Sequence, residues 1–277
     1  DVESRGLGDV YKRQPLVFGE RRVRETAILR VTRSADISVR DIMDGCDADL
    51  RAAMERLLRR RRRLEPVRAQ LQGKVTDEMR ETARTLLALP KRQLFCTSAP
   101  ADLSFVLTMP GEFDLTGLTY NEVPPAKNVA LQKGEYFAYL ARHDLLLALP
   151  YQSVNPFVDL LYEAADDPDV VSIKITLYRL AGSSRIAAAL AYAAEHGKQV
   201  QCLLELRARF DEQSNIDYSR MLEDAGCDIL YGLTQYKVHT KLCLITRRCP
   251  GGICYYTQVG TGNYNEKTLS LIHISEP

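Results

Sequence analysis

His239 and Lys241, two positions apart at the start of an apolar run, have the side chains and the spacing for phosphoryl chemistry. Side chains at positions i and i+2 of a strand point to the same face of a sheet, so these two groups can converge on one phosphoryl group. A His nitrogen can attack phosphorus, and a Lys ammonium can neutralise the equatorial oxygens. The pair alone is a weak signal, because a single His is more often a structural residue.

Two arginines strengthen this interpretation because each follows an apolar segment that is typical of a buried strand. Arg179 follows residues 170–176 (VVSIKIT), and Arg209 follows residues 200–206 (VQCLLEL). The planar guanidinium of Arg can bind two phosphate oxygens at once. The structural alternative for both arginines is an ion pair, and Arg209 lies close in sequence to two acidic residues.

The segment Gly260-Thr261-Gly262-Asn263 adds a second kind of anion contact. The two glycines let backbone amides approach an anion, and Asn263 can orient a His or bind an oxygen. By itself such a segment is usually only a turn. Glu205 lies inside an apolar strand, where an unpaired charge is costly, so we expect it to pair with an Arg or Lys.

From residue 155 onward the sequence alternates between helical and extended patterns. We expect helices at 155–165, 185–195 and 215–224, and strands at 170–176, 200–206, 228–231, 241–246 and 255–259. This alternation predicts an α/β fold with a largely parallel sheet covered by helices. Ligands of such sheets gather beyond the carboxyl ends of the strands, where the Arg, His and Lys side chains would form one cluster. That cluster suits a polyphosphate or a nucleotide.

The preceding part of the chain mixes short strands and helices. We expect a strand at 27–32 and helices at 47–63 and 76–89. The first of these helices ends in five arginines, Arg59–Arg63, which could bind a polyanion. The solvated end of a helix is the preferred interpretation, because five consecutive residues spread around a helix instead of forming one face.

The composition is that of an average soluble globular protein, with 45% hydrophobic and 26% charged residues among 277. It excludes a disordered tail, a collagen-like fibre and a small disulfide scaffold. A net charge of +1 gives no overall attraction to nucleic acid or to an anionic membrane. No run approaches the roughly 20 apolar residues of a membrane-spanning helix. Seven cysteines with no C-x-x-C pair, and no visible signal peptide, predict free or buried thiols in the cytosol.

Both ends of the sequence fit translated sequencing adapter. Asp9–Gln14 and Leu269–Pro277 back-translate to the mosaic end of a tagmentation transposon, in opposite orientations. Such segments are excluded from reasoning about the fold. We therefore expect residues 1–14 and 269–277 to be non-native and residues 15–268 to be an internal fragment of a longer protein.

Four segments in order resemble the bacterial polyphosphate kinase family, which belongs to the phospholipase D-like superfamily. They are SIKITLYRLA (172–181), LELRARFDEQSNI (204–216), KVHTKL (237–242) and GTGNYNEKT (260–268). The resemblance implies reversible transfer of the ATP γ-phosphoryl group to inorganic polyphosphate through a phosphohistidine at His239. Lys241 and Asn263 match the H-x-K and G-x-x-N elements of the superfamily. Arg179 and Arg209 match the arginines of the family's Mg²⁺–phosphate site, where we expect them to hold phosphate oxygens because Arg has no lone pair for a metal.

The resemblance also implies a domain organisation: part of the family's head (middle) domain at 15–125, an α+β unit, and a truncated first phospholipase D-like catalytic domain at 126–268. The implied partners are ATP, ADP and polyphosphate, with Mg²⁺ as cofactor, no nucleic acid, and a homo-oligomeric full-length enzyme. The implied location is cytoplasmic, with a peripheral position at the inner membrane face left open. Because a second catalytic domain would be missing, we expect the 277-residue polypeptide itself to be inactive.

Two other functions remain open at this point. A phospholipase D-like phosphodiesterase or phosphatidyltransferase would also use His239, but Thr246 replaces the Asp that the superfamily motif places five residues after the Lys. A non-catalytic module that binds polyanions through Arg59–Arg63 is the other alternative.

Overall fold

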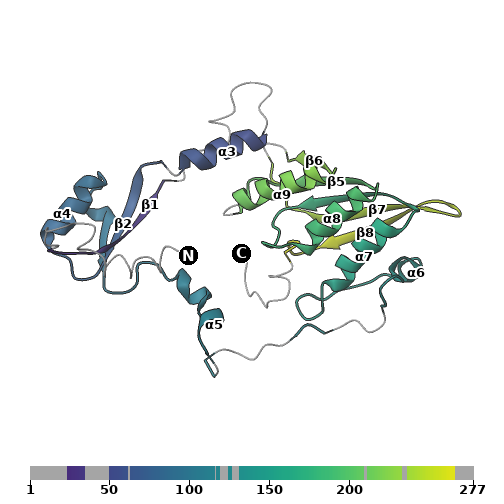
Figure 1. Cartoon of the computed structure of the whole chain (residues 1–277), viewed down its shortest axis with the longest axis horizontal. Helices are drawn as coiled ribbons and strands as arrows, with labels where there is room; N and C mark the ends of the chain where they lie inside the picture. Colours follow the sequence, from purple (N-terminus) through teal and green to yellow (C-terminus); the bar gives the residue numbers. More distant parts are fainter. Residues whose placement is uncertain are drawn as a thin grey trace. The chain divides into compact units, whose positions relative to one another are not determined.

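The structure, a computed structural model, describes residues 24–34, 50–61, 63–115, 117–118, 124–126, 131–208, 211–232 and 236–265 (Figure 1). The chain divides into two compact units, one formed by residues 1–36 and 59–120 and the other by residues 37–58 and 121–277. The division at 125/126 stays a prediction. The segments 1–14 and 269–277 lie outside the described residues. None of the described helices is long and apolar enough to cross a membrane.

The first unit contains a three-stranded sheet in the order β1-β2-β3, with an antiparallel and a parallel pairing. Its elements are β1 (Ile28–Arg33), β2 (Pro66–Gln72), α4 (Asp77–Leu86), η2 (Lys91–Gln93), β3 (Leu94–Thr97), η3 (Ser104–Leu107) and α5 (Met109–Glu112). Helix α4 begins where the side chain of Thr76 accepts a hydrogen bond from Met79 N at 3.2 Å, which satisfies one amide of the first turn. The strand expected at 27–32 and the helix expected at 76–89 are confirmed.

The second unit is built around a five-stranded sheet in the order β6-β5-β4-β7-β8. Its strands are β4 (Val170–Leu177), β5 (Gln199–Leu204), β6 (Asp228–Tyr231), β7 (Lys241–Cys249) and β8 (Gly252–Gly260). Strands β4, β5 and β6 are parallel, whereas β7 is antiparallel to both of its neighbours. The predicted mixed α/β fold with a sheet flanked by helices is confirmed, and its parallel part comprises these three strands.

Alternate residues of the central strands pack into the core of the second unit together with the helices. On β4 and β7 these are Ile173, Ile175, Cys243 and Ile245, all nearly inaccessible. The helices are α6 (Tyr136–Leu140), α7 (Asn155–Asp166), α8 (Arg185–Glu195) and α9 (Glu212–Asp224), and Figure 1 shows α7, α8 and α9 beside the sheet. Burial at every second strand position therefore fixes which side of each strand faces these helices.

Helix α3 (Leu50–Arg61) shares this core through its first turns. Met54 and Leu57 are buried in it. On α9, Arg220 Nη2 pairs with Glu55 Oε1 at 2.5 Å. The helix expected at 47–63 is thus anchored by an apolar face, as the spacing of its leucines indicates.

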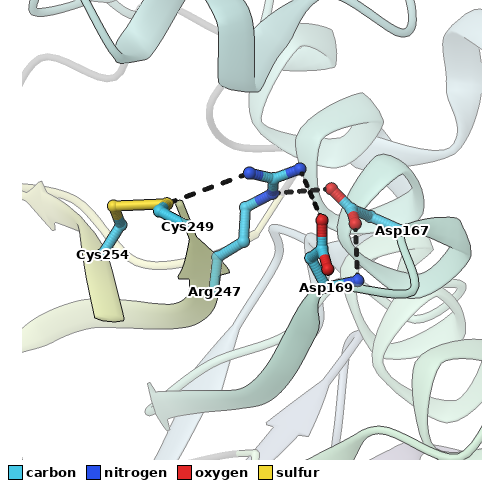
Figure 2. Close-up of a disulfide and its surroundings, with 5 residues drawn as sticks. All are labelled: Asp167, Asp169, Arg247, Cys249 and Cys254. Atoms are coloured by element: carbon cyan, nitrogen blue, oxygen red, sulfur yellow. Dashed lines mark hydrogen bonds and ion pairs between the residues drawn. A yellow bond between two sulfur atoms is a disulfide. The ribbon is translucent and has the colours of Figure 1, made fainter. Parts of the chain in front are cut away.

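The hairpin of β7 and β8 carries a disulfide between Cys249 and Cys254 (Figure 2). The antiparallel register places Cys254 opposite Arg247, diagonal to Cys249, which brings the two Cα atoms to 6.1 Å. This distance lies within the range that a disulfide spans. The expectation of free thiols is therefore wrong for these two cysteines, because a turn of the chain, and not a C-x-x-C spacing, brings them together. It holds for Cys96, Cys202, Cys227 and Cys243, of which the last three are buried.

Arg247 ties the same hairpin to the loop between α7 and β4. Its Nε lies 2.8 Å from Asp167 Oδ2, and its Nη2 lies 3.4 Å from Asp169 Oδ2. Figure 2 shows the guanidinium reaching both carboxylates. These pairs hold the end of the sheet at which β4 begins. The carboxyl ends of the parallel strands lie at the opposite edge.

Candidate active site at the carboxyl edge of the sheet

Four chain segments meet at the edge where the parallel strands end. Strands β4 and β5 end there, and because β7 runs antiparallel to β4, Lys241 at its start lies at the same edge. Lys241 also pairs with Gly260 at the end of β8. The predicted convergence at one edge is therefore found, although the antiparallel direction of β7, and not a fully parallel sheet, produces it.

Tyr178, the residue after β4, contacts three of the polar groups at this edge. Its ring meets the ring of His239 nearly perpendicularly, with centroids 5.3 Å apart. The ammonium of Lys241 lies 5.4 Å from the centroid of the Tyr178 ring, and the guanidinium carbon of Arg179 lies 5.7 Å from it. Both cations are within the range of a cation–π interaction. The sequence reasoning did not single out Tyr178; an aromatic residue directly before an Arg at a strand end is the signal that could have found it.

His239 is exposed, whereas Lys241 is only 5% exposed. The Lys241 Nζ donates a hydrogen bond to the His239 carbonyl oxygen at 2.5 Å. Strand β7 begins at Lys241, so the alternation of side chains along a strand does not extend to His239. What the two side chains share instead is their contact with the ring of Tyr178.

Thr176 fixes the start of β7 against β4. Its hydroxyl donates to the carbonyl oxygen of Thr240 at 2.6 Å and accepts from the amide of Leu242 at 3.0 Å. The residues on both sides of Lys241 are therefore held by one side chain of β4, two residues before Tyr178 in the chain.

Arg179 and Asn263 lie in different environments. The Nε of Arg179 lies 3.0 Å from Asp211 Oδ2, at the residue that precedes α9. Arg179 thus has the structural ion pair that the sequence left open. The Oδ1 of Asn263 is buried and has no hydrogen-bond partner among the described residues, so it can still accept a hydrogen bond. Arg209 lies outside the described residues.

Glu205 has the ion pair expected from its burial. It is 2% exposed, and its Oε1 lies 3.0 Å from Arg207 Nε. Two other histidines of the described residues contact tyrosines: the ring of His143 lies 5.1 Å from that of Tyr139, and His196 Nδ1 lies 2.8 Å from the carbonyl oxygen of Tyr192.

The chemistry of this edge suits a phosphorylated ligand. Lys241 and Arg179 supply positive charge, and His239 has an exposed imidazole that could act as a nucleophile; the open acceptor Asn263 Oδ1 suits an N–H donor such as an imidazole instead of a phosphate oxygen. Among the described residues, no group of three or more His, Cys, Asp and Glu side chains could hold a metal ion.

Comparisons with known proteins identify the family. Residues 135–273 match the family described as "Polyphosphate kinase C-terminal domain 1", and residues 11–109 match "Polyphosphate kinase middle domain". Both matches extend a few residues into the terminal segments 1–14 and 269–277.

Individual relatives agree with the family matches. The chain is 38% identical to "Polyphosphate kinase" of Staphylococcus haemolyticus, over 90% of this chain and 34% of that protein. It is 38% identical to "Polyphosphate kinase" of Rhodopirellula baltica, over 92% of this chain and 30% of that protein. The crystal structure of polyphosphate kinase from Porphyromonas gingivalis superimposes with a TM-score of 0.63 at 27% identity, covering 93% of this chain and 36% of the other. The chain spans about a third of the length of these relatives, and it belongs to the polyphosphate kinase family.

Proposed function

We propose that the full-length protein containing this segment transfers the γ-phosphoryl group of ATP reversibly to inorganic polyphosphate, through a phosphohistidine at His239. The observation that carries the proposal is the contact of His239, Lys241 and Arg179 with one ring, that of Tyr178, at the carboxyl edge of the sheet. An exposed nucleophile beside two cations is what transfer of an anionic phosphoryl group requires.

The reaction has two steps. In the first, a neutral imidazole nitrogen of His239 attacks the γ-phosphorus in line, a P–N bond forms, and the P–O bond to ADP breaks. In the second, a terminal oxygen of polyphosphate attacks the phosphohistidine, a P–O bond forms, and the P–N bond breaks, which regenerates His239. Lys241, Arg179 and Arg209 stabilise the charge on the transferred oxygens, and Asn263 orients the imidazole or binds an oxygen.

Mg²⁺ fits this site as a companion of the ATP phosphates. Arginine has no lone pair to donate to a metal, so Arg179 and Arg209 would hold the phosphate oxygens that carry the ion. When bound, Mg²⁺ would neutralise part of the phosphate charge. The residues of the chain would bind and orient the phosphates themselves.

We further propose that the 277-residue polypeptide is inactive or nearly so. It spans about a third of its relatives' length, so most of what the full-length proteins contain lies beyond it. The full-length protein would be a cytoplasmic homo-oligomer, or one bound peripherally at the inner membrane face. Robust ATP-dependent polyphosphate synthesis by the polypeptide alone would refute its proposed inactivity.

Phosphoenzyme formation from ATP labelled in the γ position tests the function directly. In the full-length protein, His239→Ala should abolish the acid-labile label. His196→Ala, which also removes an exposed histidine but lies at the end of α8, should leave the label unchanged. If His239→Ala retains the label, the assignment is wrong. Hydrolysis of a phosphodiester without ATP–polyphosphate exchange would instead favour a phospholipase D-like enzyme.

A further inference from the structure

Glu205 is a buried carboxylate that the two chemical steps do not use. It follows directly after β5, at the edge of the sheet that carries His239, and only 2% of its surface is exposed. Burying a charge in this way is costly unless other groups compensate for the lost water. Its partners therefore indicate what it contributes.

The partners of Glu205 hold the chain segment directly before His239. The Oε1 of Glu205 accepts hydrogen bonds from the amide of Arg207 at 2.9 Å and from Arg207 Nε at 3.0 Å. Its Oε2 accepts from the amide of Val238 at 2.9 Å. The Nη2 of Arg207 in turn donates to the carbonyl oxygen of Tyr236. Glu205 and Arg207 thus bind the backbone at both ends of the segment 236–238.

The backbone of Glu205 is itself fixed to the sheet. Its amide donates to the carbonyl oxygen of Leu177 at 3.0 Å, which continues the pairing of β4 and β5 by one residue. The side-chain amide of Asn215 on α9 donates to the carbonyl oxygens of both Glu205 and Tyr178 at 2.8 Å. The carboxylate that holds Val238 and the ring that contacts His239 are therefore anchored by the same side chain.

We propose that Glu205, together with Arg207, is a positioning residue that holds the backbone before His239 so that the imidazole stands against Tyr178 in the orientation needed for in-line attack. This inference rests on the proposed function of His239. The carboxylate acts through Val238 and Tyr236, and it does not itself contact the phosphates. A group that acts in this way should affect the rate of phosphoryl transfer more than the binding of ATP.

The test compares Glu205→Gln with Glu163→Gln in the full-length protein. Glu163 is a matched control because its carboxylate also accepts two backbone amides, those of Tyr136 and Phe137, at 3.1 and 3.2 Å, but on helix α7. Glu205→Gln should lower the rate of phosphoenzyme formation about 10- to 100-fold, with the KM for ATP changed less than about threefold. Glu163→Gln should leave both parameters near those of the wild type. Glu205→Asp, which keeps the charge, should recover part of the rate.

Two further measurements keep the inference falsifiable. If Glu205→Gln does not fold, Arg207→Met removes the hydrogen bond to Tyr236 while Glu205 stays, and it should lower the rate in the same way. Hydrogen exchange of the Val238 amide in the 277-residue chain measures whether Glu205 holds this amide, and it does not depend on phosphoryl transfer. Glu205→Gln should accelerate exchange at Val238 more than at other amides. Equal rates of phosphoenzyme formation for Glu205→Gln and Glu163→Gln, or an unchanged Val238 exchange rate, would overturn the inference. A label that survives His239→Ala would overturn the proposed function, while the exchange experiment would still decide whether Glu205 holds the segment.

Discussion

The ring of Tyr178 and the imidazole of His239 meet nearly perpendicularly, with the two centroids 5.3 Å apart. The same tyrosine faces the ammonium of Lys241 and the guanidinium of Arg179. One aromatic residue at the end of β4 therefore contacts a candidate nucleophile and two cations, although these groups come from chain segments about 60 residues apart. An aromatic ring can do this because its face attracts cations and because two aromatic rings attract each other in a perpendicular arrangement.

The contacts of Tyr178 lead to a first prediction. Tyr178→Leu should lower the rate of phosphoenzyme formation in the full-length protein about 10-fold or more, because the imidazole and the ammonium lose their common neighbour. Tyr178→Phe keeps the ring and should retain most of the rate. Single-turnover measurements with labelled ATP check both variants. A large loss for Tyr178→Phe would mean that the hydroxyl, and not the ring, is what matters.

The ion pair between Arg179 and Asp211 allows the two interpretations of Arg179 to be separated. If Arg179 binds phosphate, Asp211→Asn should raise the KM for ATP about three- to tenfold, because the guanidinium loses the partner that orients it. If Arg179 is only structural, the variant should lose stability with an unchanged KM. Asp217→Asn, an exposed carboxylate on α9, is the control and should change neither quantity. Steady-state kinetics and denaturant unfolding decide between the two results.

Most of the second unit could be predicted from the sequence because its elements have strong periodicity. The strands at 170–176 and 200–206 consist of apolar and β-branched runs, and the helices after them end at Gly197 and Gly226. Both glycines have positive φ values, 80° and 92°, as a residue that closes a helix often does. Strands β2 and β3 were not predicted, although apolar and polar residues alternate from Val67 to Gln72 and the buried residues Ala69 and Leu71 follow this alternation. The alternation in β2 is the pattern of a half-buried strand and is a signal that could have predicted it, whereas β3 has only 4 residues and is too short to show a period.

The site could be predicted only in part. The ends of the predicted strands indicated at which edge of the sheet the site lies. The cost of burying a charge predicted that Glu205 forms an ion pair. The direction of β7, the contact of Tyr178 and the disulfide of Cys249 and Cys254 depend on strand register and on packing between distant segments. Register and packing between distant segments leave no local signal in a single sequence, so the only local sign of Tyr178 is its place at a strand end directly before Arg179.

The buried thiol of Cys243 predicts how stability changes at alkaline pH. Burial raises the pKa of this thiol from 9.0 to about 12. Between these values the unfolded chain has lost the proton that the folded chain keeps, so the folded state loses stability as pH rises. The contribution is fully present below pH 9 and should fall by about 1.4 kcal/mol by pH 10. Urea unfolding at pH 8 and pH 10 measures it.

Cys243→Ala removes this titration and should make the loss between pH 8 and pH 10 smaller than in the wild type. Cys96→Ala removes an exposed thiol and should leave the pH dependence unchanged. Burial also raises the pKa of Tyr136, to about 12, so this tyrosine contributes to the loss of stability at alkaline pH as well. The difference between the two variants isolates the contribution of Cys243. Identical pH dependence for both variants would show that Cys243 does not contribute in this way.

Gly232, just after β6, packs against Val238, so a substitution at Gly232 tests the position of the segment before His239 without changing Glu205. A Cβ at this position would lie 2.7 Å from Val238 Cγ2, so Gly232→Ala must displace Val238 or the backbone that carries it. Such overpacking costs about 1–3 kcal/mol. We expect Gly232→Ala to slow phosphoenzyme formation about 10-fold, because the amide of Val238 is the group that Glu205 holds.

A second substitution should reverse this effect. Val238→Ala removes the methyl group that clashes, so Gly232→Ala/Val238→Ala should form the phosphoenzyme faster than Gly232→Ala alone. Gly182→Ala, where a Cβ meets nothing within 4 Å, is the matched control and should behave like the wild type. The rates of the wild type, Gly232→Ala, Val238→Ala and the double variant form a double-mutant cycle. In that cycle the double variant should be faster than the two single effects together would predict. Simple additivity in that cycle would mean that the packing of Gly232 against Val238 does not determine where His239 stands.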